Sequence, residues 1–440
     1  MTLRSIAVTS PLIALALFAP LAVVFVACAD QENPQGVKVP DNEVQPDGGK
    51  PSTEPTKNPD GTETKHLCKV EKKGDAGRVI VGTLLLPAGP KDGELFVDDK
   101  GIIACADEDC SKTDGYDKAT KIACTEVVIS PGLINPHDHI SFANNPPPEP
   151  ADERYEHRHD WRKGLRGHTV IKTSAPTVKN AVAAAELRFI MNGLTSTASG
   201  GSAGSGAPGL ARNIDSNAKQ LEGLPITLAV SDTFPLADSS GTMATACTGF
   251  DKDKRKKTSG IASLKGYLPH IAEGIDDEAH TEFLCQSNTF TGFPDAEHDL
   301  IQKQTAVVHG VAVNPADIQQ YRDDGSILIW SPRSNVSLYG NTAPIGAYAH
   351  LGVPIALGTD WLPSGSMNFA RELKCADDLN QKYFGKVLTD RQLWQAVTVN
   401  AAYATGTAGT IGQLKAGLVA DIAVFDASKS KSYRAVIEAG

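Results

Sequence analysis

Two histidines one residue apart, His137 and His139, are the first side chains whose spacing suggests chemistry. They end an apolar stretch that begins at Val127 and has the character of a strand. Side chains at positions i and i+2 of a strand point to the same face, so both imidazoles can reach one ion. Neutral imidazole is a common nitrogen ligand of zinc and similar metals. The pair alone is a weak signal, because two histidines on an exposed edge strand have the same spacing.

Further polar residues stand at or just after the ends of later apolar stretches. These are His270 with Glu273, then His309, then Asp360. In parallel α/β barrels the active site forms at the carboxyl ends of the strands, where side chains from different strands converge. One such histidine is more often a hydrogen-bonded core residue. Four of them at strand ends, followed by a strand-terminal aspartate, favour a metal site.

Strands and helices alternate through the part of the chain that carries these residues. After the histidine strand, strands are expected at 195–197, 226–230, 267–274, 305–309, 327–330 and 355–360, and helices at 178–192, 276–283, 343–351 and 369–382. Repeated strand–helix units predict a parallel sheet, and this number of strands favours a closed barrel. We therefore expect an α/β fold, a (β/α)8 TIM-like barrel over residues 128–400. Seven strands can be counted, and the eighth is expected to be irregular or missing within 242–265.

Short strands before the barrel, at 79–86, 94–98 and 102–103, predict a small β-domain. We expect a small β-sandwich built from both chain ends, from residues 67–127 and 401–440. The glycine-rich stretch 200–206 lacks the Gly-Lys-Ser/Thr ending of a phosphate-binding loop, so a flexible strand-to-helix connection is predicted there.

The ordered set of motifs resembles the amidohydrolase superfamily, in its mononuclear deaminase and chlorohydrolase branch. The resemblance rests on Pro131–His139, His270–Gly274, Val308–Gly310, Ser331–Asn335 and Leu357–Asp360, with 400–402, 411–417 and 420–424 resembling the return to the small domain. It covers most of the chain from Val79 to Asp426 and is more specific than any single motif. The family normally adds a further strand or two after the point where this chain ends, so a truncated C-terminus is expected.

The resemblance implies metal-assisted hydrolysis. The ligands of one divalent ion would be His137, His139, His270 and Asp360, with zinc as the favoured metal and iron as the alternative. The bound ion would lower the pKa of water from about 15.7 to about 7. Asp360 would accept the proton of that water, and His309 would orient the hydroxide or stabilise the oxyanion. Glu273 would pass a proton to a ring or leaving nitrogen, as a general acid does.

Substrate contacts and metal number also follow from the resemblance. Ser334, Asn335 and Trp361 would contact the substrate, with turn and packing roles as the alternative. Other branches bridge two metals with a carbamylated lysine on the fourth strand. The stretch 224–234 contains no lysine, which favours one metal. His157 and His159 form a second His-x-His pair, but they lie in a charged run without strand character, so we predict loop residues rather than ligands.

The N-terminus has the layout of an export signal. A basic start at Arg4 precedes an apolar stretch, 12–26, which ends in small residues before Cys28. This stretch is short for a membrane-spanning helix, which needs about 20 residues. The ending resembles a bacterial lipobox, which predicts a lipoprotein signal peptide over residues 1–28, with Cys28 as the lipidated first residue after cleavage. An ordinary signal peptide with an incidental cysteine is the alternative.

The next stretch, 29–66, is rich in Pro, Asp, Gly and Lys and poor in large apolar residues, which predicts a disordered tether. Ala29 follows Cys28, and by resemblance to Gram-negative lipoproteins this predicts an exported protein, lipid-anchored in the cell envelope at the outer membrane. Membrane contact is then expected through the lipid anchor only.

Charge and cysteine content limit the other partners. The net charge of −10 and the lack of long basic runs apart from 252–257 argue against nucleic acid as a partner. Of 8 cysteines, bridges are expected among Cys68, Cys105, Cys110 and Cys124 and between Cys247 and Cys285, with one left free. A zinc ribbon at Cys105 and Cys110 lacks a matching second half. The oligomeric state is not predictable from the sequence.

These observations lead to one main hypothesis and two alternatives. The main hypothesis is a metal-dependent hydrolase of non-peptide C–N bonds in a small cyclic or aminated compound. The first alternative is hydrolysis of acylated amino acids or dipeptides. The second is a non-catalytic surface binding lipoprotein, which the retention of every ligand disfavours.

Overall fold

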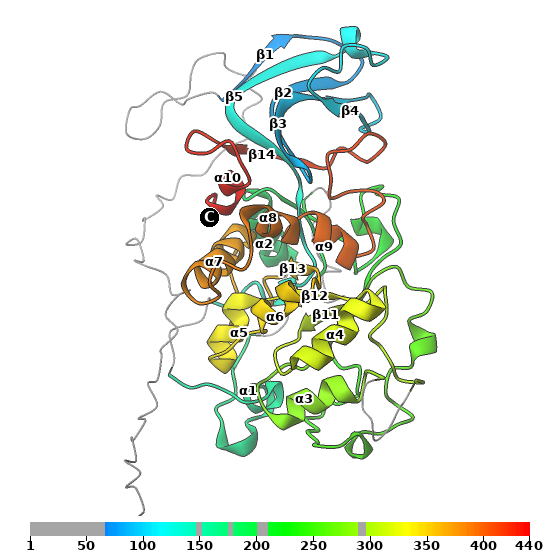
Figure 1. Ribbon diagram of the computed structural model, residues 1–440, viewed down its shortest axis with the longest axis vertical. Helices are drawn as coiled ribbons and strands as arrows, with labels where there is room; N and C mark the ends of the chain where they lie inside the picture. The colour runs from blue at the N-terminus through cyan, green and yellow to red at the C-terminus, as the bar shows by residue number, and fades with distance from the viewer. Residues whose placement is uncertain (1–66, 147–151, 175–178, 200–209, 289–295) are drawn as a thin grey trace, which may run out of the picture.

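The structure is a computed structural model that describes residues 67–146, 152–174, 179–199, 210–288 and 296–440. The predicted signal peptide with Cys28, the predicted tether and the glycine-rich stretch 200–206 lie outside the described residues. A small β-domain lies above a larger α/β domain in the view of Figure 1. Among the described residues, no helix combines the length and the apolar character that crossing a bilayer requires.

The small domain contains strands from both ends of the described chain. Its six-stranded sheet has the order β1–β5–β2–β3–β4, with β14 paired to β5. The strands are β1 (Cys68–Lys72), β2 (Arg78–Leu86), β3 (Gly89–Val97), β4 (Ile103–Asp107), β5 (Thr120–Pro131) and β14 (Ile422–Asp426). β14 runs antiparallel to the last five residues of β5, so the C-terminal part of the chain holds the segment that leads into the histidines. The pairings join these strands in one sheet, and the β-sandwich stays a prediction.

The α/β domain contains a three-stranded and a five-stranded sheet, and neighbouring strands in both sheets run parallel. The strands are β6 (Leu133–Asn135), β7 (Leu194–Thr197), β8 (Arg212–Asn213), β9 (Val230–Asp232), β10 (Tyr267–Ile271), β11 (Ala306–His309), β12 (Ile327–Trp330) and β13 (Ile355–Leu357). The two sheets are connected at both of their edges. Next to β8 and β9, the Ala229 amide donates to the Ile214 carbonyl over 3.0 Å. After β6 and β13, Asp138 and Asp360 form a parallel bridge. The arrangement is TIM-barrel-like.

The position predicted for the eighth strand was wrong. The strand is β8, whereas the region 242–265 contains short 3-10 turns at Cys247–Gly249 and Thr258–Gly260 and no strand. β8 has two residues, Arg212 and Asn213, and neither is apolar. The Arg212 guanidinium is neutralised by the Asp421 carboxylate at 2.8 Å. No apolar pattern therefore marks this strand in the sequence.

Helices pack around the parallel strands, whose central members are fully buried (Figure 1). They are α1 (Arg158–Lys163), α2 (Lys179–Ile190), α3 (Asp277–Leu284), α4 (Pro315–Asp324), α5 (Pro332–Tyr339), α6 (Ile345–His350), α7 (Phe369–Lys382), α8 (Asp390–Ala396), α9 (Val399–Ala404) and α10 (Arg434–Ile437). Local signals explain their ends. α4, for example, begins after Asn314, whose side chain accepts the Ala316 and Asp317 amides, and it ends at Gly325 with a left-handed φ of 73°.

The expected disulfides are present. Cys68 bonds to Cys124, Cys105 to Cys110 and Cys247 to Cys285. Cys375 is also disulfide-bonded, so the expectation of one free cysteine was wrong for the described residues.

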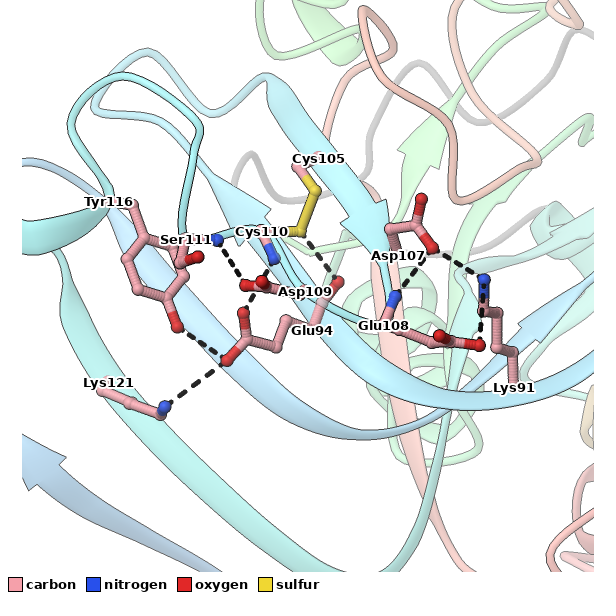
Figure 2. Close-up of a disulfide and its surroundings, with 10 residues drawn as sticks. All are labelled: Lys91, Glu94, Cys105, Asp107, Glu108, Asp109, Cys110, Ser111, Tyr116 and Lys121. Carbon is pink, nitrogen blue, oxygen red and sulfur yellow. Dashed lines mark hydrogen bonds and ion pairs between the residues drawn. A yellow bond between two sulfur atoms is a disulfide. The ribbon is translucent and has the colours of Figure 1, made fainter.

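The Cys105–Cys110 bridge lies beside Glu94, which accepts hydrogen bonds from the Tyr116 hydroxyl at 2.6 Å and the Cys110 amide at 3.0 Å (Figure 2). A zinc ribbon is thereby excluded at this pair, because both sulfurs are used in the disulfide. The bridge and the Glu94 contacts together hold the loop after β4 against β3.

Candidate metal centre and active site

Asn135, the last residue of β6, ties the two strand ends that carry the first histidines and the aspartate. Its side-chain amide donates to the Thr359 hydroxyl at 2.6 Å, and that hydroxyl donates to Asp138 at 2.6 Å. The Asp360 amide donates to the His137 carbonyl at 3.1 Å. Gly358 permits this approach, because a Cβ there would lie 2.7 Å from the Cβ of His137. The His-x-His segment and Asp360 are therefore fixed side by side.

The predicted ligands come together at this point. His137 Nε2 lies 3.2 Å from Asp360 Oδ1, and His139 Nε2 lies 3.8 Å from the same oxygen. The ring centroid of His270 is 4.7 Å from that of His137 and 5.5 Å from that of His139. One nitrogen from each of these three histidines lies within 4.8 Å of the others. Four residues from three strand ends thus face one small volume.

The backbone is strained where it aims these side chains. His309 has φ 75° and Asp360 has φ 58°, both in the left-handed region that non-glycine residues seldom adopt. Ala272, immediately before Glu273, has φ 57°. Each such residue costs about 1–3 kcal/mol and is found mainly where a site requires it. The strain marks the same strand ends that the sequence pattern singled out.

Burial keeps His139, His270 and His309 neutral. It lowers the pKa of His139 to about 3 and that of His309 to about 3, and it holds the pKa of His270 well below the ordinary value. Burial also disfavours the charged form of Asp360, but the hydrogen bond with His137 and the surrounding histidines outweigh this and lower its pKa. Neutral imidazoles beside an ionised carboxylate are the protonation states that metal ligation requires.

Glu273 has the opposite electrostatics. Burial raises its pKa to about 7, against the opposing influence of Arg158. Its Oε2 lies 3.5 Å from His309 Nε2, and its Oε1 accepts a hydrogen bond from the Tyr339 hydroxyl at 2.8 Å. A carboxyl group with this pKa can hold a proton near neutral pH and release it within reach of His309.

Two residues of α5 form hydrogen bonds with side chains of the site. The Ser334 hydroxyl donates to Asp360 Oδ2 at 2.6 Å, and the Asn335 amide nitrogen lies 3.1 Å from His309 Nδ1. Both side chains are fully buried, with their polar groups engaged by site residues. Substrate contact by Ser334 and Asn335, as expected from the sequence, stays a prediction.

The donor set fits a metal ion. It offers three imidazole nitrogens and a carboxylate oxygen, a combination that zinc and related divalent ions accept. His270 Nδ1 is buried and has no hydrogen-bond partner, although buried polar atoms are nearly always paired. His139 is the most accessible ligand, with 18% of its side chain exposed, so the site opens on that side.

Comparison with known proteins agrees with this geometry. The model of the amidohydrolase family matches residues 128–439, which is most of the chain. The chain belongs to the amidohydrolase family. Membership of this family makes the protein a metal-dependent hydrolytic enzyme.

Two curated relatives cover most of this amidohydrolase. It is 26% identical to an imidazolonepropionase of Shouchella clausii over 70% of this chain and 73% of the relative. It is 24% identical to a 5-methylthioadenosine/S-adenosylhomocysteine deaminase of Halobacterium salinarum, over 80% and 84%. Among solved structures, an atrazine chlorohydrolase of Arthrobacter aurescens complexed with zinc has a TM-score of 0.53 at 16% identity, over 80% and 87%. The structural match shows the shared fold.

Aromatic rings lie beside the site of this amidohydrolase. The ring centroid of Trp361 lies 4.8 Å from that of Trp161 of α1 and 5.5 Å from that of Phe142. The ring centroids of Phe142 and His139 are 6.5 Å apart. The Trp361 Nε1 donor is buried without a hydrogen-bond partner. The predicted substrate residue Trp361 is thus part of an aromatic group near the more open side of the centre.

Sequence reasoning missed the residues around Glu273. Tyr339 follows Asn335 by one helical turn on α5, and this spacing was an available signal. Arg158, whose Nη1 lies 3.7 Å from Glu273 Oε2, gave no signal. The prediction that His157 and His159 are loop residues was wrong, because they lie at the start of α1, buried against Glu282 and Asp238. That they do not bind a metal stays a prediction.

Proposed function

We propose that this amidohydrolase uses one bound divalent ion, zinc in preference to iron, to hydrolyse a C–N bond of a small cyclic or aminated compound. The observation that carries the proposal is the convergence of three histidines and an ionised Asp360 beside a carboxyl group, Glu273, that can hold a proton. The zinc bound in the atrazine chlorohydrolase and the names of the two curated relatives support it. We also propose that the eight parallel strands form a closed barrel.

The residues that would hold the ion are His137, His139, His270 and Asp360. When bound, the ion supplies hydroxide at neutral pH by lowering the pKa of water to about 7. Asp360 would accept the proton of the attacking water, because its carboxylate is ionised. The Ser334 hydroxyl, which donates to Asp360 Oδ2 at 2.6 Å, holds that carboxylate in place. Ser334 and Asn335 hold Asp360 and His309 in place.

Proton delivery falls to Glu273. Its pKa of about 7 leaves a substantial protonated fraction at neutral pH, which a general acid needs. The proton passes to a ring nitrogen or to the leaving nitrogen, and the departing group is then neutral. His309, neutral and 3.5 Å from Glu273, donates a hydrogen bond to the oxygen that gains negative charge at the carbon under attack.

A substrate panel tests the proposal. Purified protein, loaded with zinc or iron and checked for metal content, is incubated with aminated heterocycles and cyclic amides, and ammonia or ring opening is measured. Turnover that disappears on chelation and returns with metal supports the proposal. Release of free amino acid from acylated amino acids or dipeptides, without turnover of the first panel, would replace it. No turnover of any compound by metal-loaded protein would favour a binding protein.

We further propose that the protein is exported and anchored in the outer membrane by lipid on Cys28, which the N-terminal sequence pattern supports. Mass spectrometry of the N-terminal peptide from a membrane fraction tests this. A thioether-linked diacylglycerol on Cys28 supports the anchor. An N-terminal peptide in which Cys28 carries no lipid would contradict the anchor.

A further inference from the structure

We propose that the segment Tyr155–Trp161, acting with Tyr339, is a positioning element that fixes the carboxyl group of Glu273. The inference rests on the proposed function, in which Glu273 moves a proton. It assigns a role to Arg158, Trp161 and Tyr339, which the metal centre does not use. The segment lies in the connection between β6 and α2 and reaches across to the end of β10.

The segment pairs with the backbone on both sides of Glu273. The Arg158 amide donates to the Glu273 carbonyl at 3.1 Å, and the Ile275 amide donates to the Glu156 carbonyl at 2.7 Å. His157 and Gly274 form an antiparallel bridge. A Cβ at Gly274 would lie 2.4 Å from the Glu156 carbonyl oxygen, so glycine is what allows the two chains to approach.

Arg158 then connects Glu273 to a buried charge cluster. Its side chain is 1% exposed, and its Nη2 lies 2.5 Å from Asp238 Oδ2 and 3.0 Å from Glu282 Oε1. These two carboxylates neutralise the guanidinium, whose rigid planar fork leaves Nη1 to face Glu273 Oε2 at 3.7 Å. Glu282 Oε2 also accepts the Glu273 amide at 3.2 Å. The cluster thus holds both the main chain and the side chain of Glu273.

The second oxygen of Glu273 is held from the same segment. Tyr339 donates to Glu273 Oε1 at 2.8 Å, and the Trp161 Nε1 donates to the Tyr339 hydroxyl at 3.1 Å. The two carboxyl oxygens therefore face two different groups, Tyr339 and Arg158. Rotation of the carboxyl out of this plane would weaken both interactions, and a half-turn would only exchange the two oxygens. One carboxyl oxygen is therefore kept directed toward His309.

The two carboxylates that contact Arg158 are also paired with histidines of the segment. His157 Nε2 lies 3.3 Å from Glu282, and His159 Nε2 lies 2.9 Å from Asp238. If the segment Tyr155–Trp161 had only a structural role, these contacts and the backbone pairing would be sufficient. The direct approach of Arg158 and Tyr339 to the two oxygens of Glu273 is what indicates positioning of the carboxyl group.

Variants at the two contacts test the inference on the metal-loaded full chain, with a substrate on which the wild type is active. Arg158→Gln removes the charge, Arg158→Lys retains it, and Tyr339→Phe removes only a hydroxyl. Arg434→Gln is the matched arginine control, because Arg434 pairs with Asp377 and Asp390 away from the site. Tyr267→Phe is the matched tyrosine control, because its hydroxyl donates to Asp232 at 2.8 Å. Metal content, melting temperature, kcat and KM are measured for each.

We expect Arg158→Gln and Tyr339→Phe to lower kcat tenfold or more with KM within threefold of wild type and metal content unchanged. Arg158→Lys should lose less than Arg158→Gln, and both controls should keep wild-type kcat. Tyr339→Phe keeps the test decisive if Arg158→Gln fails to fold. Wild-type kcat in Tyr339→Phe, or a loss that follows melting temperature equally in the controls, would overturn the inference alone. An inactive wild type would instead overturn the proposed function, and this inference with it.

Discussion

Replacing Asp360 by asparagine should abolish turnover while the fold stays intact. Asparagine has nearly the same shape, and its oxygen can still accept the Trp361 amide, which lies 2.7 Å from Asp360 Oδ1. The Ser334 hydroxyl can turn to accept from the new amide nitrogen and donate to Ser364, 2.8 Å away. The substitution therefore removes one negative charge and one proton acceptor and leaves the hydrogen-bond framework satisfied.

The size of the effect follows from the two roles of Asp360. Loss of a positioned general base costs about 10²–10⁴ in rate, or about 2.7–5.4 kcal/mol of transition-state stabilisation. Loss of the only anionic ligand also weakens metal binding. With free metal at about 100 times Kd, binding stabilises the fold by about 2.7 kcal/mol, and a 100-fold weaker site leaves about 0.4 kcal/mol. The difference of about 2.3 kcal/mol corresponds to a melting temperature lower by roughly 3 °C for a folded part of this size.

The assay compares wild type and Asp360→Asn by metal content, by melting temperature with and without chelator, and by turnover. Chelation should lower the melting temperature of wild type and leave that of the variant nearly unchanged. Asp377→Asn is the control, because Asp377 is a buried carboxyl that pairs with Arg434 away from the site. Wild-type metal affinity and near-normal turnover in Asp360→Asn would refute the assigned roles, and so would equal losses in Asp377→Asn.

Three further predictions concern one residue that supports Asp360, one buried carboxyl group and one disulfide. Ser334→Ala removes the hydrogen bond to Asp360 and should weaken metal affinity about 10–100-fold, measured by competition with a chelating dye; unchanged affinity would remove Ser334 from its supporting role. Burial raises the pKa of Glu186 to about 7 from 4.5, so the folded state favours its protonated form and stability falls as pH rises from about 4.5 to 7. Glu186→Gln should therefore be more stable than wild type above pH 7 by about 1–2 kcal/mol in urea denaturation, after a discount for solvent screening, and equal pH slopes would contradict this. The bridge between Cys247 and Cys285 spans 38 residues, so replacing both by serine should cost about 4 kcal/mol in the same assay; no loss would show that the reduced chain is equally constrained.

Much of the fold could be predicted because the central strands are short, apolar and bounded by turns. The predicted strand 327–330 coincides with β12, and the predicted helix 369–382 coincides with α7. The prediction failed at β8, where Arg212 and Asn213 form a strand through polar contacts made far along the chain. A two-residue strand has no periodicity to detect, and its ion pair with Asp421 forms only in the folded state.

In the candidate site, too, some residues could be predicted from the sequence and others could not. His137, His139, His270 and Asp360 could be placed together because each stands at the end of a recognisable strand. The run from His157 to Asp160 has the composition of an exposed loop, yet all four of its side chains are buried. Its charges are tolerated inside because partners such as Asp238 and Glu282 neutralise them. Those partners lie many residues away, so the sequence alone does not reveal the pairing.

The two carboxyl groups of the centre owe their different assignments to their surroundings. Both Glu273 and Asp360 are buried, and burial alone raises the pKa of each. At Asp360 the hydrogen bond with His137 reverses that effect, so the group stays ionised and can accept a proton. At Glu273 the charge of Arg158, with Nη1 3.7 Å away, offsets burial only in part, and the pKa remains near 7. Opposite shifts on neighbouring carboxyl groups separate a base from an acid. The distance between Arg158 and Glu273 therefore bears directly on which of the two groups carries the proton to the substrate.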